Sequence, residues 1–440
     1  MGRRKLLANA EILTLDAADE VLHRADVGID GATIDWIGHA PEGWSADDRV
    51  DLTGHALLPG FWNAHTHAAM VLTRSLADDL SLDRWFNERI WIAESGLTAD
   101  DIYWGGLLAA AEMIRSGTVG FADHYFQTHR MVEVVEQAGL KALLAETIFS
   151  DPPAFGHDLE SSLESAQRLH GMAGGRIHAA LGPHSTYLCA PELLREVAEA
   201  ARDSRLSVHI HVAESSAQVE ASVSRYGMTP IQQLAELGVF DRPTIAAHCI
   251  AVTDDDLGIL SAHDVTAVQC PRCHMKLGLG VTPVVAMDAR GIRVALGTDG
   301  AGSNNNLDML EEARLAALIH KHSTGDAEVL AGDAPLRLAG PNGAAALGFG
   351  DSGVIRAGAS ADLIALDLRR SHIQPIFSLV GSVLHAANSA DIVHTLVDGQ
   401  WLMRNRELVT LDEERILAEA PARAVAMVDR GRSRIQTYPA

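Results

Sequence analysis

Eight short apolar segments, separated by amphipathic helical stretches, constrain the fold of this chain more than any other feature. The expected strands are 57–64, 118–123, 140–149, 176–183, 206–212, 244–248, 265–270 and 293–298. Helical segments such as 101–116 and 191–203 lie between them. Strands that alternate with helices over roughly 250 residues are typical of a (β/α)8 barrel. We therefore predict an α/β fold in which residues 57–352 form a TIM barrel with its active site at the C-terminal ends of the strands.

Both ends of the chain instead have a β pattern. Apolar runs and turn residues alternate from about 6 to 55, with Asp30-Gly31 as a hairpin signal. The pattern returns at 362–366, 392–397 and 400–403. An isolated hairpin is only marginally stable, so each end needs a partner. We predict that 1–56 and 353–440 form one composite β-sandwich beside the barrel. The glycine pattern at 348–353 has no strand before it and is interpreted as a turn.

Histidines occupy the ends of two predicted barrel strands. His65 and His67 end the first strand and, at a spacing of two, face the same way. In the fifth strand, His209 and His211 share the face opposite to Val208, Ile210 and Val212. His211 is nearer the C-terminal end and is the better candidate ligand, whereas His209 is interpreted as a packed histidine behind it. Paired imidazoles of this kind suit zinc or iron.

Two more strands end in polar side chains, His248 after Ala246-Ala247 and Asp299 after Gly297-Thr298. We predict that one divalent ion, zinc with iron as the alternative, binds His65, His67, His211 and Asp299. A metal lowers the pKa of bound water from about 15.7 to about 7. Glu214, three residues after His211, can carry the water proton to the substrate, and His248 can hydrogen-bond the hydroxide or developing oxyanion. Glu214, His248 and Asp299 are thus the predicted catalytic residues.

Charge and cysteine content exclude several other classes of protein. The formal net charge of −23 argues against binding to nucleic acid or to an anionic membrane. No run of about 18 apolar residues is present, and the first residues do not form a signal peptide, so we expect a cytoplasmic protein. Cys270-Pro271-Arg272-Cys273-His274 has the spacing of covalent haem attachment. The alternatives are a structural zinc site and a loop that happens to hold two cysteines.

The polar motifs resemble those of the amidohydrolase superfamily and, within it, the aminohydrolase branch. They look like those of 5-methylthioadenosine/S-adenosylhomocysteine deaminases, with s-triazine chlorohydrolases as near neighbours. The motifs are Pro59-Gly60-Phe61-Trp62-Asn63-Ala64-His65-Thr66-His67, Gly182-Pro183-His184, His211-Val212-Ala213-Glu214, Ala247-His248-Cys249 and Gly297-Thr298-Asp299-Gly300-Ala301-Gly302-Ser303. Dinuclear relatives use a carbamylated lysine on the fourth strand. Segment 121–210 holds only Lys141, so we expect a single metal.

The resemblance implies hydrolytic deamination of an amino-substituted N-heterocycle, most similar to an adenosine-type nucleoside, with release of ammonia. Glu214 would contact the substrate and protonate a ring nitrogen, and His184 would contact the base. Glu94, in Glu94-Ser95-Gly96-Leu97-Thr98, would bind ribose hydroxyls. Ser303 is assigned to the substrate site. Trp85 either lines the pocket or is a core aromatic of helix 82–89. Relatives often self-associate, so a homo-oligomer is expected.

Two departures from the resemblance leave the substrate open. Relatives that bind S-adenosylhomocysteine have an arginine on the third strand, where this chain has Glu146. A carboxylate there would repel a carboxylated substrate or pair with a cationic one. In the relatives, the loop after the seventh strand usually has the pattern Asn-Pro-x-Ser-Asn-x-Lys-Leu. This chain matches it only at Pro271 and Lys276-Leu277, so Arg272 or His274 could contact a different edge of the substrate ring. The alternatives are a triazine hydrolase that displaces halide or alkylamine, and a deaminase of a pterin or guanine-like base.

Overall fold

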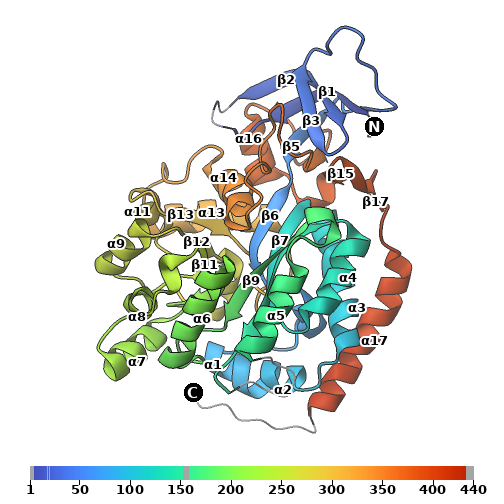
Figure 1. Ribbon diagram of the computed structural model, residues 1–440. Helices are drawn as coiled ribbons and strands as arrows, with labels where there is room; N and C mark the ends of the chain where they lie inside the picture. The colour runs from blue at the N-terminus through green and yellow to red at the C-terminus, as the bar shows by residue number, and fades with distance from the viewer. Residues whose placement is uncertain (1–3, 17, 19, 152–157, 433–440) are drawn as a thin grey trace.

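A computed structural model describes residues 4–16, 18, 20–151 and 158–432. Its centre is a barrel of parallel strands, with a β unit at one end and a long C-terminal helix along one side (Figure 1). The eight barrel strands pair in chain order and are β6 (Phe61–Thr66), β7 (Thr118–Tyr125), β8 (Lys141–Ile148), β9 (Ile177–Pro183), β10 (Ser207–Val212), β11 (Thr244–His248), β12 (Val265–Gln269) and β13 (Arg293–Leu296). The predicted TIM barrel is confirmed.

The seam between β13 and β6 is held largely by side chains. The backbone N–H of Asp299 donates to the carbonyl of His65 at 3.0 Å. Asn63 accepts from the N–H of Thr298 at 3.0 Å and donates to its hydroxyl at 2.7 Å. An asparagine amide can replace both halves of a backbone pair, so this residue joins the first and last strands near the site.

Helices cover the outside of the barrel because each has one apolar face. In α6 (Pro191–Ser204), Leu194, Val197, Ala198 and Ala201 are buried at helical spacing, and Pro191 occupies the first turn. The other covering helices are α3 (Ala99–Arg115), α4 (Thr128–Ala138), α5 (Leu159–Leu169), α7 (Ser216–Tyr226), α8 (Pro230–Glu236), α9 (Asp254–Ala262), α10 (Pro271–Leu277), α11 (Val284–Asp288), α12 (Ala301–Asn304), α13 (Met309–Thr324), α14 (Ala334–Ala339) and α15 (Pro341–Ala346).

Both chain ends contribute to one β unit beside the barrel, as predicted, and the structure joins their strands into a single mixed sheet. Its nine strands are β1 (Lys5–Leu13), β2 (Val21–Asp30), β3 (Thr33–Gly38), β4 (Asp48–Asp51), β5 (His55–Pro59), β14 (Leu363–Asp367), β15 (Ile392–Val397), β16 (Gln400–Arg404) and β17 (Glu407–Leu408). Asp30 pairs with Thr33 across the expected hairpin. Leu7 and Ile34 from the N-terminal half share a buried core with Leu363 and Leu396 from the C-terminal half. Each half therefore supplies the apolar partner that the other lacks.

The first predicted strand, 57–64, is in fact two strands. β5 pairs with β1 and β14 in the mixed sheet, and β6 begins the barrel. Gly60 separates them: its N–H donates to the carbonyl of Asp362, in register with the last pair of β5 and β14, and β6 begins at the next residue. A Cβ on Gly60 would lie 2.1 Å from Val119, so only glycine fits where the chain passes from one sheet to the other.

The sequence patterns above did not predict α17 (Glu413–Gly431), which runs along the barrel helices (Figure 1). Its Ile416, Ala420 and Met427 are buried. A Cβ on Gly96 would lie 2.2 Å from the carbonyl of Met427, so α17 approaches the chain after α2 (Trp91–Glu94) at backbone distance. In the part of the chain that the structure describes, no helix has the length and apolar content needed to cross a membrane.

Candidate active site

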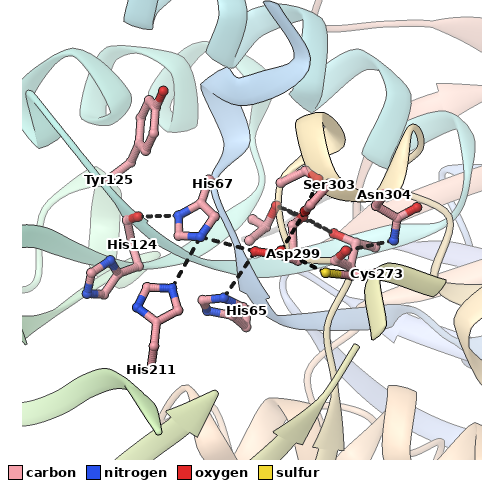
Figure 2. A network of polar contacts seen from close by, with 12 residues as sticks. His65, His67, His124, Tyr125, His211, Cys273, Asp299, Ser303 and Asn304 are labelled. Carbon is pink, nitrogen blue, oxygen red and sulfur yellow. Dashed lines mark hydrogen bonds and ion pairs between the residues drawn. The ribbon is translucent and has the colours of Figure 1, made fainter. Parts of the chain in front are cut away.

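The four predicted metal ligands lie together at the C-terminal end of the barrel (Figure 2). Nε2 of His67 lies 3.3 Å from Nε2 of His211 and 3.1 Å from Oδ1 of Asp299. Nε2 of His65 lies 3.3 Å from the same Oδ1. Three imidazole nitrogens and one carboxylate oxygen from β6, β10 and the end of β13 therefore meet at one point.

Each histidine is held so that Nε2 faces this point. Nδ1 of His67 lies 2.5 Å from the carbonyl of His124, and Nδ1 of His211 lies 2.7 Å from the carbonyl of His184. A carbonyl only accepts, so both Nδ1 atoms donate and both Nε2 lone pairs are free. His65 contacts Nε2 of His209 through its Nδ1 at 2.8 Å. This confirms His209 as the packed histidine behind a ligand.

The two carboxylate oxygens of Asp299 have different partners. Oδ1 faces His65 and His67, whereas Oδ2 accepts from the Ser303 hydroxyl at 2.5 Å and from the Cys273 thiol at 3.1 Å. Burial would raise the pKa of Asp299, but the adjacent imidazoles of His65 and His67 outweigh it and hold that pKa well below its usual range. The residue has a φ of 60°, a conformation that is uncommon outside glycine and that aims the side chain inward.

The donor set fits a divalent cation. Nε2 of His65 is buried and has no hydrogen-bond partner among the described residues. Without a cation, the inward lone pairs of three histidines would face one another and a carboxylate, which is unfavourable in a buried site. Histidine nitrogens and carboxylate oxygens are both ligands of catalytic zinc, which can become five-coordinate and so accept a further oxygen. The residues therefore match a divalent metal.

Glu214 and His248 flank this centre. Oε1 of Glu214 lies 3.8 Å from Nε2 of His248, too far for a hydrogen bond, and the gap can hold a reacting oxygen. Oε2 of Glu214 accepts from the Gln218 amide at 3.2 Å. Burial raises the pKa of Glu214. The Thr282 hydroxyl donates to the carbonyl of His248 at 2.7 Å and holds its backbone, whose φ is 76°.

A cavity with an aromatic lining leads to the centre. The space between its walls, which opens to solvent, is about 550 Å³. All the predicted site residues except His65 line it, and its apolar walls come from Met70, Leu82, Trp85, Phe86, Trp91, Tyr125, Phe126, Phe149 and Leu277. Trp85 is both a core aromatic and a cavity residue. Its ring is buried and lines the cavity, and its N–H donates to the carbonyl of Gly302 at 3.1 Å.

The proposed substrate residues lie at different walls. Glu94 ends α2, and its Oε1 accepts from the Tyr125 hydroxyl at 2.5 Å. Burial raises the pKa of Glu94 to about 7, although this hydrogen bond opposes the shift. His184 follows β9 and stacks on Phe149, with ring centroids 5.3 Å apart. Ser303 lines the cavity, but its hydroxyl donates to Asp299.

Sequence reasoning missed the residues at the ends of β7 and β8. β7 continues to Tyr125, two residues beyond the predicted end, and brings His124 and Tyr125 to the cavity. Thr147 and Phe149 reach it from β8. The available signal was the run Asp123-His124-Tyr125, in which polar residues follow an apolar strand as at the other strand ends.

Two residues singled out in the sequence lie outside the cavity. Glu146 accepts from the backbone N–H groups of Gln127 and Thr128 at 2.6 and 3.1 Å, so its carboxylate caps α4 and does not face a substrate. Arg272 forms an ion pair with Glu311 and does not line the cavity. The prediction that Arg272 reads a ring edge is therefore wrong.

The Cys270–His274 segment forms part of the barrel wall. Cys270 and Cys273 are both fully buried, which is unsuitable for covalent attachment of haem. His274 is buried behind His248 and does not line the cavity. Lys141 opens β8 at the end opposite to the metal ligands and pairs with Asp362, so it cannot bridge two metals.

Comparison with known proteins agrees with this geometry. Residues 56–402 match the model of the amidohydrolase family. This chain belongs to the amidohydrolase family. A 5-methylthioadenosine/S-adenosylhomocysteine deaminase of Pelotomaculum thermopropionicum is 43% identical over 97% of this chain and 99% of its own length. A 5′-deoxyadenosine deaminase of Methanosarcina mazei is 39% identical over 97% of this amidohydrolase and 98% of its own length.

Solved structures show the same fold. An adenosine deaminase of Xanthomonas campestris with bound zinc superposes with a TM-score of 0.93 at 31% identity, covering 98% of this chain and 99% of that one. An atrazine chlorohydrolase of Arthrobacter aurescens superposes with a TM-score of 0.88 at 24% identity, covering 96% and 100%. The second likeness concerns the fold alone.

Proposed function

We propose that this amidohydrolase is a zinc-dependent deaminase of adenosine-type nucleosides. One observation carries the proposal: four candidate ligands for a divalent metal lie beside a buried glutamate, in a cavity with an aromatic lining. The nucleoside deaminases among its relatives support the same reaction. When bound, the metal supplies a Lewis acid that makes a water molecule nucleophilic at neutral pH.

Glu214 moves the proton in this scheme. The attacking water gives up a proton to the carboxylate, which delivers it to the ring nitrogen beside the amine-bearing carbon. Because burial raises the pKa of Glu214, the protonated form is less costly here than on an exposed glutamate. The Gln218 amide holds one oxygen and leaves Oε1 free to face the substrate. His248 donates to the attacking oxygen from the other side.

The cavity walls position the nucleoside. The rings of Trp85, His184 and Phe149 line the cavity and suit a flat base, and the Glu94 carboxylate can accept hydrogen bonds from ribose hydroxyls. Ser303 supports the site through Asp299, whose Oδ2 it holds. These assignments rest on the family resemblance and on where each side chain lies.

The same walls favour a substrate with a neutral 5′ group. Among the described residues, no lysine or arginine lines the cavity, and residues 152–157 contain neither type in their sequence. A buried carboxylate without a cationic partner is costly. S-adenosylhomocysteine carries such a carboxylate, whereas adenosine, 5′-deoxyadenosine and 5-methylthioadenosine do not. We expect the three neutral nucleosides to be the better substrates.

Metal analysis combined with ammonia release tests the function. The purified protein should bind one equivalent of zinc and release ammonia from the neutral nucleosides, more slowly from S-adenosylhomocysteine, and not from aminotriazines, pterins or guanine. Glu214→Gln should keep the metal and lose about 10²–10⁴-fold in kcat, as expected for loss of a general acid–base group. Absence of ammonia from every nucleoside with metal bound would refute the proposal. Cytoplasmic location and self-association stay predictions.

A further inference from the structure

A second imidazole lies directly behind His248, on the side away from the cavity. His274, in α10, places its Nε2 3.1 Å from Nδ1 of His248, and both residues are about 1% exposed. His274 belongs to the Cys270–His274 segment, which the proposed chemistry leaves without a role. The other ring nitrogen of His274, Nδ1, is buried and has no hydrogen-bond partner among the described residues.

The position of the protons in this pair can be worked out from the contacts. A neutral imidazole has one N–H and one bare nitrogen, and the two facing nitrogens must be one donor and one acceptor. If His248 donated from Nδ1, the proton of His274 would lie on its Nδ1, and a buried N–H would have no acceptor. If His274 donates from Nε2, the unpartnered atom is a bare nitrogen. Orphaned buried N–H groups are rarer than unfilled acceptors, which favours the second arrangement.

The cavity side of His248 favours the same arrangement. Its Nε2 lies 3.8 Å from a carboxylate oxygen of Glu214, and a ring nitrogen of His248 lies within 4.8 Å of Asp299. A bare nitrogen would direct a lone pair at two carboxylates, whereas an N–H directs positive charge at them. Both sides of the ring therefore place its proton on Nε2.

We propose that His274 is a positioning residue that fixes the tautomer of His248. By donating to Nδ1, it keeps the proton on Nε2, where His248 donates to the oxygen that attacks the substrate ring. This inference rests on the proposed deaminase function. That oxygen belongs to the attacking water, which loses a proton to Glu214 as the reaction proceeds, and not to the nucleoside, so loss of His274 lowers kcat much more than it raises KM.

A series at position 274 separates hydrogen bonding from packing. His274→Asn keeps an N–H donor and should stay within about 5-fold of the wild-type kcat. His274→Leu removes the donor and should lose about 10–100-fold, and His274→Asp, which accepts from Nδ1, should lose about 10³-fold or more. KM for adenosine should change less than about 5-fold throughout. If His274 served only for packing, His274→Leu would keep a higher kcat than His274→Asn. That order would overturn the proposal.

A matched control is His320, a buried histidine whose Nε2 contacts the Gln269 amide oxygen at 3.1 Å, outside the cavity lining. His320→Leu should alter stability but not kcat. If it lowers kcat as His274→Leu does, the effect at 274 is not specific and the proposal fails.

Nitrogen NMR of histidine-labelled protein gives a readout that does not depend on activity. His248→Gln identifies the signals of His248 by their loss. The wild type should show a protonated Nε2 and a bare Nδ1 for this ring, and His274→Asp should move the proton to Nδ1. A protonated Nδ1 in the wild type would overturn the inference even if the enzyme deaminates nucleosides. Conversely, the expected NMR result without any ammonia release would refute the proposed function alone.

Discussion

At the residue scale, the most informative side chain is Asp299, whose two oxygens face different partners. Oδ1 faces the histidines, and Oδ2 is held by the Ser303 hydroxyl and the Cys273 thiol. Groups behind a metal ligand orient it, and their loss typically lowers metal affinity by about 10–100-fold. The hydroxyl is a stronger donor than the thiol. Ser303 should therefore matter more than Cys273 for metal binding.

We expect Ser303→Ala to weaken zinc binding by about 10-fold or more and Cys273→Ala to weaken it less. Competition with a chromophoric chelator measures both affinities. Cys189→Ala is the control, because Cys189 is buried and its thiol donates to the carbonyl of Ile148 at 3.3 Å. Equal zinc affinity in Ser303→Ala and the wild type would contradict the role given to this hydroxyl.

Glu94 gives a prediction for pH. Its pKa of about 7 lies above the usual value because of burial, so the carboxylate is protonated as the pH falls through 7. A protonated carboxyl accepts fewer hydrogen bonds from ribose, and KM for adenosine should rise below pH 7 and level off above it. Glu94→Gln should raise KM by about 10-fold or more at pH 8 and remove this dependence.

A nucleoside without ribose hydroxyls serves as the control for Glu94. KM for 2′,3′-dideoxyadenosine should lack the rise below pH 7 that adenosine shows. If both nucleosides show the same profile, Glu94 does not bind the hydroxyls.

The candidate metal ligands could be chosen from sequence because each lies at or just beyond the end of a strand, and strand periodicity determines which side chains face inward. No knowledge of tertiary contacts was needed to predict that His65, His67 and His211 lie together. The environment of the Glu146 side chain could not be predicted in this way. It lies on β8 one residue before Thr147, and the alternation along that strand sends Thr147 to the cavity and Glu146 to α4. The polar partner of a side chain depends on a neighbouring element that the sequence does not show.

At the element scale, α4 depends on this carboxylate. Gln127, at the helix N-cap, has a φ of 55° and makes no side-chain capping bond. The Glu146 carboxylate instead accepts from the N–H groups of Gln127 and Thr128 and from the Thr128 hydroxyl. A negative charge at a helix N-terminus also interacts favourably with the helix dipole. The cap of α4 is therefore supplied by the next strand of the barrel.

Removing this cap should affect stability and not specificity. We expect Glu146→Ala to lower the free energy of unfolding by about 1–3 kcal/mol, and Glu146→Gln, which keeps one acceptor, to lower it less. Denaturant unfolding measures both. The ratio of kcat/KM for adenosine to that for S-adenosylhomocysteine should not change. A large gain in activity toward S-adenosylhomocysteine would instead place Glu146 at the substrate.

Two features of the elements escaped sequence reasoning for physical reasons. Strands β5 and β6 form one apolar run, and only the close approach of Gly60 to Val119 shows where the chain changes sheets. Helix α17 has few buried residues. The glycines Gly96 and Gly431 allow its backbone to come close to α2 and the chain after it. Its apolar face is too interrupted to stand out beside the β pattern that precedes it.

At the scale of the whole molecule, the barrel and the mixed sheet meet through a buried ion pair. Nζ of Lys141, at the start of β8, lies 2.7 Å from Asp362 and 2.7 Å from Asp398. The side chains of Lys141 and Asp362 are 5% and 1% exposed. Asp362 also accepts from the Ser352 hydroxyl at 2.7 Å. The division of the chain at residues 56 and 353 stays a prediction, and this contact is where it can be tested.

Removing one partner of a buried ion pair leaves an uncompensated charge and typically costs about 3–5 kcal/mol. We expect Lys141→Met to destabilise the protein by this amount, and Lys141→Met combined with Asp362→Asn to recover part of it because the buried negative charge is also removed. Denaturant unfolding followed by both tryptophan fluorescence and circular dichroism measures the effect. If the barrel and the sheet are separate units, the single variant should also split one transition into two. An unchanged midpoint would mean that Lys141 is dispensable at this junction, and that apolar contacts such as Ile364 and Ile392 near Gly117 hold the two parts together.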